Sequence, residues 1–232
     1  MVLITGGAQG LGSSIARIFA RNNNDIILTY LTNEEKALKL GKEIKDKYNV
    51  KCIVKKLDIT CENDVKKIFD EHSIDIVINN ASFSNDNYIE NKSFDEFMDV
   101  VKVNLGGTYL VCKYASGAKY IINISSTDGI NTYSPISLDY SASKAGIINL
   151  SKNLSLYYRD KKIYCVCPNW INTESVLSMN QEYLESELKR IGQNELLDKD
   201  YVAKEIYKLI DSDKISGSVV IIDEEKWNNR IN

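Results

Sequence analysis

The run Tyr140-Ser141-Ala142-Ser143-Lys144 places a phenol and an ammonium group four residues apart. On a helix, side chains with this spacing lie on one face and can interact. A nearby cation stabilises phenolate, so we expect Lys144 to lower the pKa of Tyr140 from its ordinary value of about 10. Such a tyrosine can exchange protons near neutral pH. Taken alone the pair is typical of a surface contact. A Gly-rich turn at the start of the chain strengthens its interpretation as an acid–base pair.

That opening is a Gly-rich turn, Thr5-Gly6-Gly7-Ala8-Gln9-Gly10-Leu11-Gly12, between a short apolar run and a helical pattern. A strand–turn–helix of this kind brings backbone amides close to a pyrophosphate at a helix N-terminus. The glycine spacing, G-x3-G-x-G, differs from the familiar G-x-G-x-x-G of dinucleotide-binding proteins. Its position at the start of a strand–helix–strand pattern nevertheless predicts nucleotide binding.

Strand-like and helix-like segments alternate along the chain without a repeat or a low-complexity linker. We expect strands at Val2–Thr5, Asp25–Tyr30, Val50–Leu57, Ile74–Asn79, Tyr120–Ser125, Ile163–Cys167 and Val219–Ile222. The clearest expected helices are one capped by Asn33, then Ser93–Leu110, Tyr140–Tyr158 and Tyr201–Ile210. This alternation predicts an α/β protein: a single-domain, Rossmann-like, doubly wound parallel sheet of about seven strands with helices on both faces.

Bulk properties fit one soluble domain spanning residues 1–232. A net charge of −3 gives no reason to expect nucleic acid or an anionic membrane as a partner. No apolar run approaches the roughly 20 residues that span a bilayer. Because Met1–Ile4 already resembles a strand, we expect no signal peptide. Five cysteines without paired metal spacing and a single histidine, His72, favour a reduced, cytoplasmic protein with no metal.

The adenosine end of a nucleotide site usually has an acid about 20 residues beyond the glycines. Asp25 has that spacing but begins a strand, whereas ligands bind beyond the carboxyl ends of strands. The strand ends instead in Tyr30-Leu31-Thr32-Asn33, without an acid or an arginine. Thr32 and Asn33 can donate to a 2′-phosphate, so we expect NADP(H) to be favoured over NAD(H). Arg17 and Lys36 are interpreted as solvated helix residues.

Together these residues resemble the short-chain dehydrogenase/reductase family, in particular its 3-oxoacyl-[acyl-carrier-protein] reductases. The resemblance extends from Val2 to about Asp223, with the motifs in family order. These motifs are Thr5–Gly12, Asp58-Ile59, Asn79-Asn80-Ala81, Asn104, Ser125-Ser126, Tyr140–Lys144 and Pro168 to Thr173. The resemblance implies an NAD(P)-dependent oxidoreductase that reduces a 3-oxoacyl thioester-like substrate or a small ketone.

The resemblance also implies roles for four catalytic residues. Tyr140 would protonate the substrate oxygen, and Lys144 would lower the pKa of Tyr140 and bind the nicotinamide ribose. Ser126 would polarise the carbonyl; Ser125 is the competing choice, but the spacing to Tyr140 fits Ser126 better. Asn104 would support a water chain that resupplies protons through Lys144.

The implied cofactor residues extend beyond the glycine turn. Asp58 and Ile59 would bracket the adenine, Asn80 and Ala81 would lie against the adenosine ribose, and Thr173 would touch the nicotinamide amide or the phosphates. The full set is Gly6, Gln9, Gly10, Leu11, Gly12, Thr32, Asn33, Asp58, Ile59, Asn80, Ala81, Tyr140, Lys144, Pro168 and Thr173.

Three departures from the family pattern are Ser82, Asn169 and Glu224-Glu225, each where the family has glycine. We expect none of them to touch the proton-transfer residues. Asn tolerates left-handed backbone, so the turn at Asn169 is expected to survive. The Glu pair leaves the C-terminal packing open.

Glu174 to about Asp200 is expected to form a substrate loop and its helices. Its apolar residues either line a pocket or, for most of them, form the buried face of a lid helix. These residues are Leu177, Met179, Tyr183, Leu184 and Leu188. Arg159, Lys161 and Lys162 are candidate contacts for an acyl carrier protein, although the short segment before Tyr120 makes carrier recognition doubtful. Two alternatives stay open. One is a sugar or polyol dehydrogenase with the same catalytic residues, and the other is a nucleotide sensor without turnover.

Family resemblance further suggests a homotetramer or a dimer built through the helices at Ser93–Leu110 and Tyr140–Tyr158. Apolar positions on these helices serve either that interface or the core of one chain. They are Phe94, Phe97, Val101, Ile147, Leu150 and Leu154.

Overall fold

The computed structural model describes residues 1–224, which form one seven-stranded parallel sheet in the order β3-β2-β1-β4-β5-β6-β7. The strands are β1 (Val2–Ile4), β2 (Ile26–Tyr30), β3 (Cys52–Lys56), β4 (Ile76–Asn79), β5 (Tyr120–Ile124), β6 (Lys162–Pro168) and β7 (Val219–Ile222). The predicted fold class and all seven expected strands are confirmed, with ends that shift by one or two residues. Glu225, one of the residues of the predicted C-terminal departure, lies outside the described residues.

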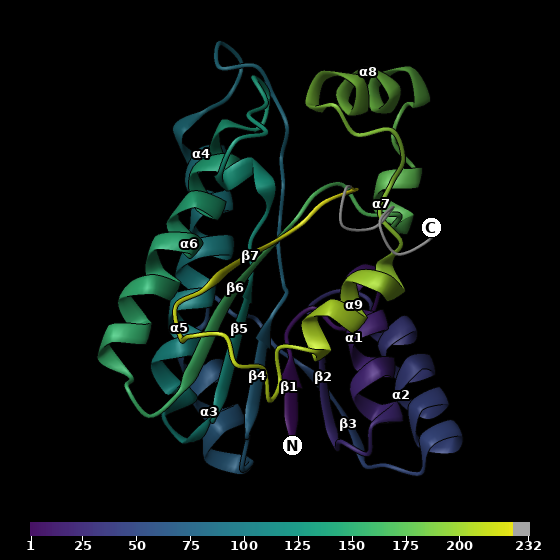
Figure 1. Cartoon of the computed structure of the whole chain (residues 1–232), viewed down its shortest axis with the longest axis vertical. Helices are drawn as coiled ribbons and strands as arrows, with labels where there is room; N and C mark the ends of the chain where they lie inside the picture. The colour runs from purple at the N-terminus through teal and green to yellow at the C-terminus, as the bar shows by residue number, and fades with distance from the viewer. Residues whose placement is uncertain (225–232) are drawn as a thin grey trace.

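Helices cover both faces of the sheet (Figure 1). On one side lie α1 (Gly10–Arg21), α2 (Glu34–Tyr48) and α9 (Lys199–Tyr207); on the other lie α3 (Glu62–Glu71), α4 (Phe94–Val101), α5 (Thr108–Tyr114) and α6 (Leu138–Tyr157). Two further helices, α7 (Glu174–Leu177) and α8 (Gln181–Ile191), rise beyond one end of the sheet.

The core is double because side chains alternate across each strand. Val2 and Ile4 of β1 pack with α1, whereas Leu3 points to the other face and packs with residues of α3 and α5. All three side chains are fully buried. Apolar residues at successive positions therefore serve two layers of helices, as is usual for a buried parallel strand.

The predicted helix Ser93–Leu110 is not a uniform α-helix. Ser93 caps α4 through a capping box with Glu96, and residues Lys102–Gly107 then form a π-helical turn before α5 begins. Such turns are rare and commonly found at functional sites. Asn104 lies within this turn and is fully buried, so it is not the solvent-facing residue that its mid-helix position favours in isolation.

Strands β1 and β4 lie side by side although two strand–helix units separate them in sequence. The strand order reverses at this point, and in open α/β sheets ligands bind just outside the carboxyl ends of the strands there. Two hydrogen bonds from the backbone amides of Asn80 and Ala81 to the Thr5 hydroxyl, each of 3.0 Å, join the two strand ends.

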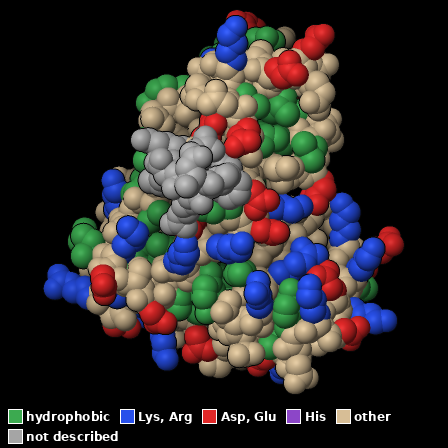
Figure 2. Space-filling view, turned by 45° about the vertical axis from the view of Figure 1, so that its right-hand side comes forward, with side chains coloured by type: hydrophobic (Ala, Val, Ile, Leu, Met, Phe, Trp, Pro, Cys, Tyr) green, Lys and Arg blue, Asp and Glu red, His purple; other side chains and the backbone are tan. Residues whose placement is uncertain are grey.

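Positive and negative side chains are interspersed over the face in Figure 2. No helix among residues 1–224 is long and apolar enough to cross a membrane.

Candidate active site

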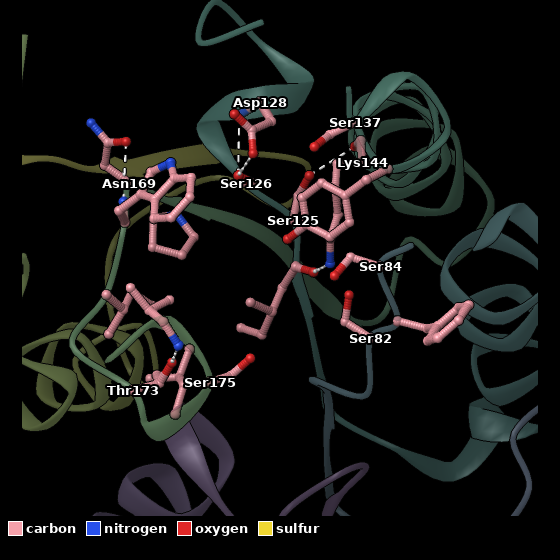
Figure 3. A pocket seen from close by; sticks show the side chains of 18 of the residues that line it. Ser82, Ser84, Ser125, Ser126, Asp128, Ser137, Lys144, Asn169, Thr173 and Ser175 are labelled. Atoms are coloured by element: carbon pink, nitrogen blue, oxygen red, sulfur yellow. Dashed lines mark hydrogen bonds between the residues drawn. The ribbon is translucent and has the colours of Figure 1, made fainter. Parts of the chain in front are cut away.

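A cavity of about 320 Å³ opens at the carboxyl ends of β1, β4, β5 and β6 (Figure 3). Seven residues of the predicted site line it, together with Ser125, the competing choice to Ser126: Leu11, Asn80, Ser126, Tyr140, Lys144, Pro168 and Thr173. The other lining residues are Ser82, Phe83, Ser84, Asp86, Ile124, Asp128, Ser137, Asn169, Trp170, Ile171, Ser175, Val176 and Met179. Segments between Leu11 and Met179 thus meet at one cavity.

Tyr140 and Lys144 lie on one face of α6, as their spacing predicts. The Lys144 ammonium lies 5.2 Å from the centre of the Tyr140 ring and donates a 3.1 Å hydrogen bond to the Ile124 carbonyl. The expected lowering of the tyrosine pKa is wrong. Burial and the Asp128 carboxylate raise the pKa of Tyr140 above its ordinary value, whereas the Ser82 and Ser126 hydroxyls lower it by less.

Burial also affects Lys144 itself, which is 2% exposed. Removal from water lowers the pKa of Lys144 to about 8, against smaller opposing effects of Cys165, Cys167 and Asp128. The ammonium therefore carries only part of its charge in mildly alkaline solution. Burial therefore favours the neutral form of both side chains.

The two neighbouring serines differ in their hydrogen bonds. Ser125 donates a 2.7 Å bond to the backbone carbonyl of Lys144 and so helps to hold α6 against β5. Ser126 instead accepts a 3.1 Å bond from the Asp128 amide, lies 3.3 Å from the Asp128 carboxylate, and acts on the Tyr140 hydroxyl. The catalytic choice of Ser126 over Ser125 stays a prediction.

Asn104 connects the π-helical turn to the loop between β4 and α4, residues 80–93, which we call the β4–α4 loop. Its side-chain oxygen accepts bonds from the Phe83 amide (2.8 Å) and the Ser82 hydroxyl (3.3 Å). Its amide donates to the Phe83 carbonyl (2.9 Å) and the Ser143 hydroxyl (3.0 Å). Asn104 therefore stands behind the cavity wall.

Ser82 overturns one expectation about the departures from the family pattern. Its hydroxyl reaches Asn104 and also acts on Tyr140, so this departure does touch the predicted proton-transfer residues. A glycine at this position has no hydroxyl to offer. At Asn169 the expected left-handed backbone is absent, because the positive φ angles among residues 1–224 lie elsewhere. The Asn169 side chain instead accepts bonds from Trp170 and Thr127.

The glycine turn forms a cradle that larger residues would fill. Gly6 and Gly10 have φ angles of +60° and +53°, a region that side chains disfavour. A Cβ atom on Gly12 would lie 2.6 Å from both the Asn80 side chain and the Gly6 carbonyl. Asn80 donates 3.0 Å bonds to the carbonyls of Thr5 and Gly6. Asn80 thus shapes the turn, and the tight backbone that starts α1 fits a dinucleotide pyrophosphate.

Thr173 and Glu174 bring α7 to this turn. The Glu174 carboxylate accepts a 3.2 Å bond from the Gly10 amide and lies 3.2 Å from the Lys199 ammonium. A carboxylate at this amide occupies a position suited to an anionic group. The phosphate contact of the turn stays a prediction.

The predicted adenosine end lies outside the cavity. Thr32 and Asn33 are exposed, and the Asn33 side chain, rather than capping α2 as expected, donates a 2.9 Å bond to Gln9. Lys36 reaches the same Gln9 oxygen at 3.4 Å. Arg17 is held by two 2.8 Å bonds to Glu43, which leaves it turned away from this group.

Asp58 and Ile59 have local structural roles. The Asp58 carboxylate accepts 2.8 Å bonds from the amide and hydroxyl of Thr60, whereas the residue that caps α3 is Cys61. Ile59 is 7% exposed and fills the space against Gly107 of the π-helical turn. Ala81 packs against Gly6. Asn80 and Ala81, the two residues predicted to lie against the adenosine ribose, therefore both lie close to the glycine turn.

Two carboxylates on the cavity wall, Asp86 and Asp128, were missed by the sequence reasoning. Asp128 follows Ser126 by two residues, and this spacing was the available signal. Burial raises the pKa of Asp128, which also accepts a 2.8 Å bond from Thr132. Among residues 1–224, no group of three or more His, Cys, Asp or Glu side chains could hold a metal ion.

In the expected substrate loop, Met179 lines the cavity and Leu184 is only 4% exposed. Leu177 is 52% exposed, so the apolar residues do not share one role. The prediction that Lys161 contacts an acyl carrier protein is wrong. Its side chain is 4% exposed, and its ammonium donates to the Ser116 carbonyl and pairs with Asp160.

Comparisons with known proteins agree with this arrangement. The model of the short chain dehydrogenase family matches residues 1–184. A 3-oxoacyl-[acyl-carrier-protein] reductase of Chlamydia muridarum is 31% identical over 239 residues, which cover 95% of this chain and 94% of that protein. The chain belongs to the short-chain dehydrogenase family and is an NAD(P)-dependent oxidoreductase. The predicted family is confirmed.

Two solved structures have the same fold. A short chain dehydrogenase from Burkholderia cenocepacia in complex with NADP has a TM-score of 0.86 at 22% identity, covering 96% of this chain and 95% of that one. A 3-oxoacyl-[acyl-carrier protein] reductase from Brucella melitensis with bound NAD has a TM-score of 0.84 at 25% identity, covering 95% and 88%.

Proposed function

We propose that this protein reduces a ketone to an alcohol, with Tyr140 as the general acid. The observation that carries the proposal is the convergence of Tyr140, Ser126 and Lys144 on one cavity that the glycine-turn residue Leu11 also lines. An oxidoreductase needs its proton donor beside its nicotinamide, and a cavity shared by these residues and the glycine turn supports that arrangement. A nucleotide sensor without turnover needs no such donor.

The chain's own residues divide the work of proton transfer. Tyr140 donates its phenolic proton to the substrate oxygen, and Ser126 donates a hydrogen bond that polarises the carbonyl. For this the Ser126 hydroxyl turns from Asp128 toward the substrate. Lys144, whose ammonium lies 5.2 Å from the centre of the Tyr140 ring, passes on the replacement proton, and Asn104 supports the water chain that delivers it. A bound nicotinamide supplies the hydride.

The cofactor is proposed to be NADP(H) rather than NAD(H). Gln9, Asn33 and Lys36 form a hydrogen-bonded group beside the glycine turn, and two of them carry donors suited to a 2′-phosphate. Lys36, which the sequence pattern predicts to be a solvated helix residue, adds a positive charge to this group. The remaining contacts proposed for the cofactor are those of the glycine turn, Asp58, Ile59, Asn80, Ala81, Pro168 and Thr173.

The substrate is proposed to be a 3-oxoacyl thioester-like compound or a small ketone, as the name of the Chlamydia relative suggests. A second candidate, a sugar or polyol, is favoured by one observation. The cavity wall carries hydroxyl and carboxylate groups, including Ser82, Ser84, Ser137, Asp86 and Asp128. These groups suit a substrate with several hydroxyls. An acyl carrier protein is a less favoured partner because Lys161 is buried.

We further propose that residues 1–232 act as one catalytic unit in the cytoplasm and assemble as a dimer or tetramer. On α4 and α6, Phe94 is 75% exposed and Tyr157 is 78% exposed, whereas Ile147 is 1% exposed and belongs to the core. The exposed aromatic side chains support association through these helices. Light scattering that finds only monomer at working concentrations would refute this.

The test of the proposed function is oxidation of NADPH with an acetoacetyl thioester, a small ketone and an oxidised sugar as alternative oxidants. NADH is run alongside each. We expect turnover with NADPH, and a fall in the NADPH-to-NADH preference in the Lys36→Ala variant. Binding of NADPH without turnover of any oxidant would favour the sensor.

A further inference from the structure

A buried ion pair lies directly beside the active-site tyrosine. The Lys92 ammonium contacts the Asp139 carboxylate, and their side chains are only 5% and 0% exposed. These residues are 47 positions apart in sequence. Lys92 belongs to the β4–α4 loop, whereas Asp139 lies in the first turn of α6. The pair therefore joins two separate walls of the site.

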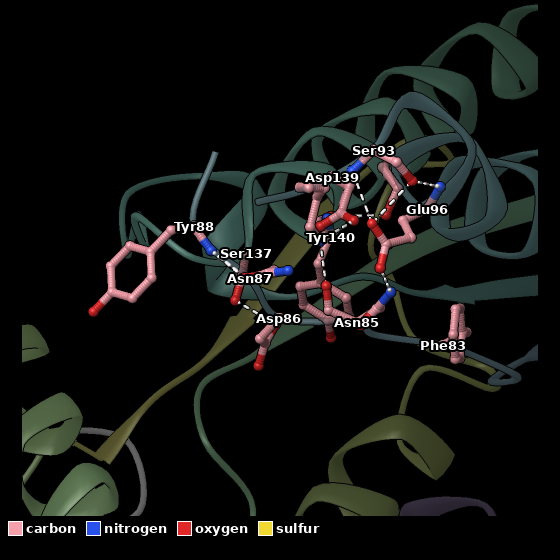
Figure 4. Close-up of polar contacts among 12 residues, drawn as sticks. Phe83, Asn85, Asp86, Asn87, Tyr88, Ser93, Glu96, Ser137, Asp139 and Tyr140 are labelled. Carbon is pink, nitrogen blue, oxygen red and sulfur yellow. Dashed lines mark hydrogen bonds and ion pairs between the residues drawn. The ribbon is translucent and has the colours of Figure 1, made fainter. Parts of the chain in front are cut away.

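Each member of the pair also binds backbone close to the cavity. A carboxylate oxygen of Asp139 accepts a 2.8 Å bond from the Tyr140 amide, and the Lys92 ammonium donates to the Asn85 carbonyl. Figure 4 shows Asp139 beside Tyr140, with Asn85 and Asp86 of the loop close by. A chain of three contacts thus leads from the loop backbone to the backbone of Tyr140.

Further bonds fasten the same loop to the segment before α6. The Ser137 hydroxyl donates a 2.7 Å bond to Asp86, and the Asn87 amide donates a 2.9 Å bond to the Ile136 carbonyl. The fastened loop carries Ser82 and Asp86, which line the cavity and influence Tyr140. Lys92 is a cation of this junction, where it contacts Asp139 and the Asn85 carbonyl.

We propose that Lys92, through Asp139, is a positioning residue that fixes Tyr140 relative to the loop wall of the cavity. The inference rests on the proposed function of Tyr140 as the proton donor. A buried ion pair contributes little stability compared with apolar residues of similar size, because both charges lose their water. The proposed contribution of this ion pair is orientation, because its two charges hold the β4–α4 loop and the start of α6 in one arrangement.

Charge balance gives the pair a second measurable effect. The charged groups around Tyr140 are Lys144 on α6, Asp86 and Lys92 on the loop, Asp128 after β5, and Asp139 itself. Without Lys92, the Asp139 carboxylate next to Tyr140 loses its cation. Where that carboxylate stays ionised, its negative charge disfavours phenolate and moves the titration of the tyrosine to higher pH.

The experiment compares kcat, KM and the pH profile of kcat in Lys92→Met, Lys92→Arg and the double variant Lys92→Met/Asp139→Leu. We expect Lys92→Met to lower kcat at least tenfold with little change in KM for NADPH, and to shift the pH profile upward. Lys92→Arg should restore most of kcat. The double variant lacks both charges of the pair and is expected to fold; it should keep the low kcat but lose the pH shift.

Lys161→Met is the matched control. Lys161 is also a buried lysine that bonds a backbone carbonyl and pairs with a carboxylate, but it lies outside the cavity lining. We expect this variant to lose stability and retain kcat. An active wild type with unchanged kcat in both Lys92→Met and the double variant would overturn the positioning role. A wild type without turnover would instead overturn the proposed function.

Discussion

The Lys144 ammonium lies 5.2 Å from the centre of the Tyr140 ring, yet burial rather than their mutual attraction is the main cause of the pKa shift of both side chains. Burial raises the pKa of Tyr140 and lowers the pKa of Lys144 to about 8. The two groups therefore resist charging, and any charge beside them acts in a region poor in water.

The lowered pKa of Lys144 makes folding stability depend on pH. An unfolded lysine titrates near 10.4, so the unfolded chain binds this proton more tightly than the folded protein does. The lysine is therefore most destabilising below pH 8, and this cost fades as the pH rises from 8 to 10. Above pH 10 the raised pKa of Tyr140 acts in the opposite direction, because the unfolded chain loses that proton first.

We accordingly expect the free energy of unfolding of the wild type to gain on the order of 2 to 3 kcal/mol relative to Lys144→Met between pH 7.5 and 10. Urea unfolding of both proteins at several pH values measures this difference. Parallel curves across that range would show that Lys144 keeps an ordinary pKa in the folded protein.

Replacing Tyr140 with Phe removes the proposed acid and keeps the ring that packs beside Lys144. Loss of general acid catalysis typically costs about 10²- to 10⁴-fold in rate, and we expect kcat to fall within that range. The dissociation constant for NADPH, measured by fluorescence titration, should change less than about threefold because the ring remains. Retained turnover would remove Tyr140 from the mechanism.

Substitutions of the two serines at the end of β5 should have different effects on activity and on stability. Ser126→Ala removes a donor to the reacting oxygen, and we expect kcat to fall about 10²-fold. Ser125→Ala removes a buried bond to the Lys144 carbonyl, so it should cost about 1 kcal/mol in stability with a small effect on kcat. Steady-state kinetics and thermal unfolding of both variants test the assignment, and the reverse pattern would exchange the two roles.

Gly12 tests the cofactor cradle. The Cβ atom of Gly12→Ala would meet Asn80 and Gly6 at 2.6 Å, and the adjustment should cost about 1 to 3 kcal/mol. Because the turn itself must shift, we expect the affinity for NADPH to fall at least about tenfold. The matched control is Gly117→Ala, where a Cβ atom meets nothing within 4 Å. Calorimetric titration that finds equal affinities would contradict a phosphate site at this turn.

Residues with strong local patterns were the predictable ones. The alternating apolar strands, the glycine turn and the Tyr140–Lys144 spacing each follow from short-range rules, and the structure brings them to one edge of the sheet. The pKa of Tyr140 was not predictable in this way. It depends on burial and on Asp128 and Ser82, which come from different segments and meet only in the fold.

The adenosine end shows the same limit. Asn33 has the identity and position of a helix cap, but its side chain bonds Gln9 across the glycine turn. Lys36, which looks like any surface lysine of an amphipathic helix, reaches the same oxygen. Lys92 has no sequence signal either, because its partner Asp139 is supplied by a helix 47 residues away.

The π-helical turn at Lys102–Gly107 is equivalent to one extra residue inserted into an α-helix. Each residue of an α-helix advances the side chains by about 100°, so one insertion reorients everything on one side of it relative to the other. Two helices, α4 and α5, therefore keep separate packing faces while the misfit is confined to one turn. Removing a single residue there would restore a regular helix and would break the alignment that lets a buried amide serve the cavity.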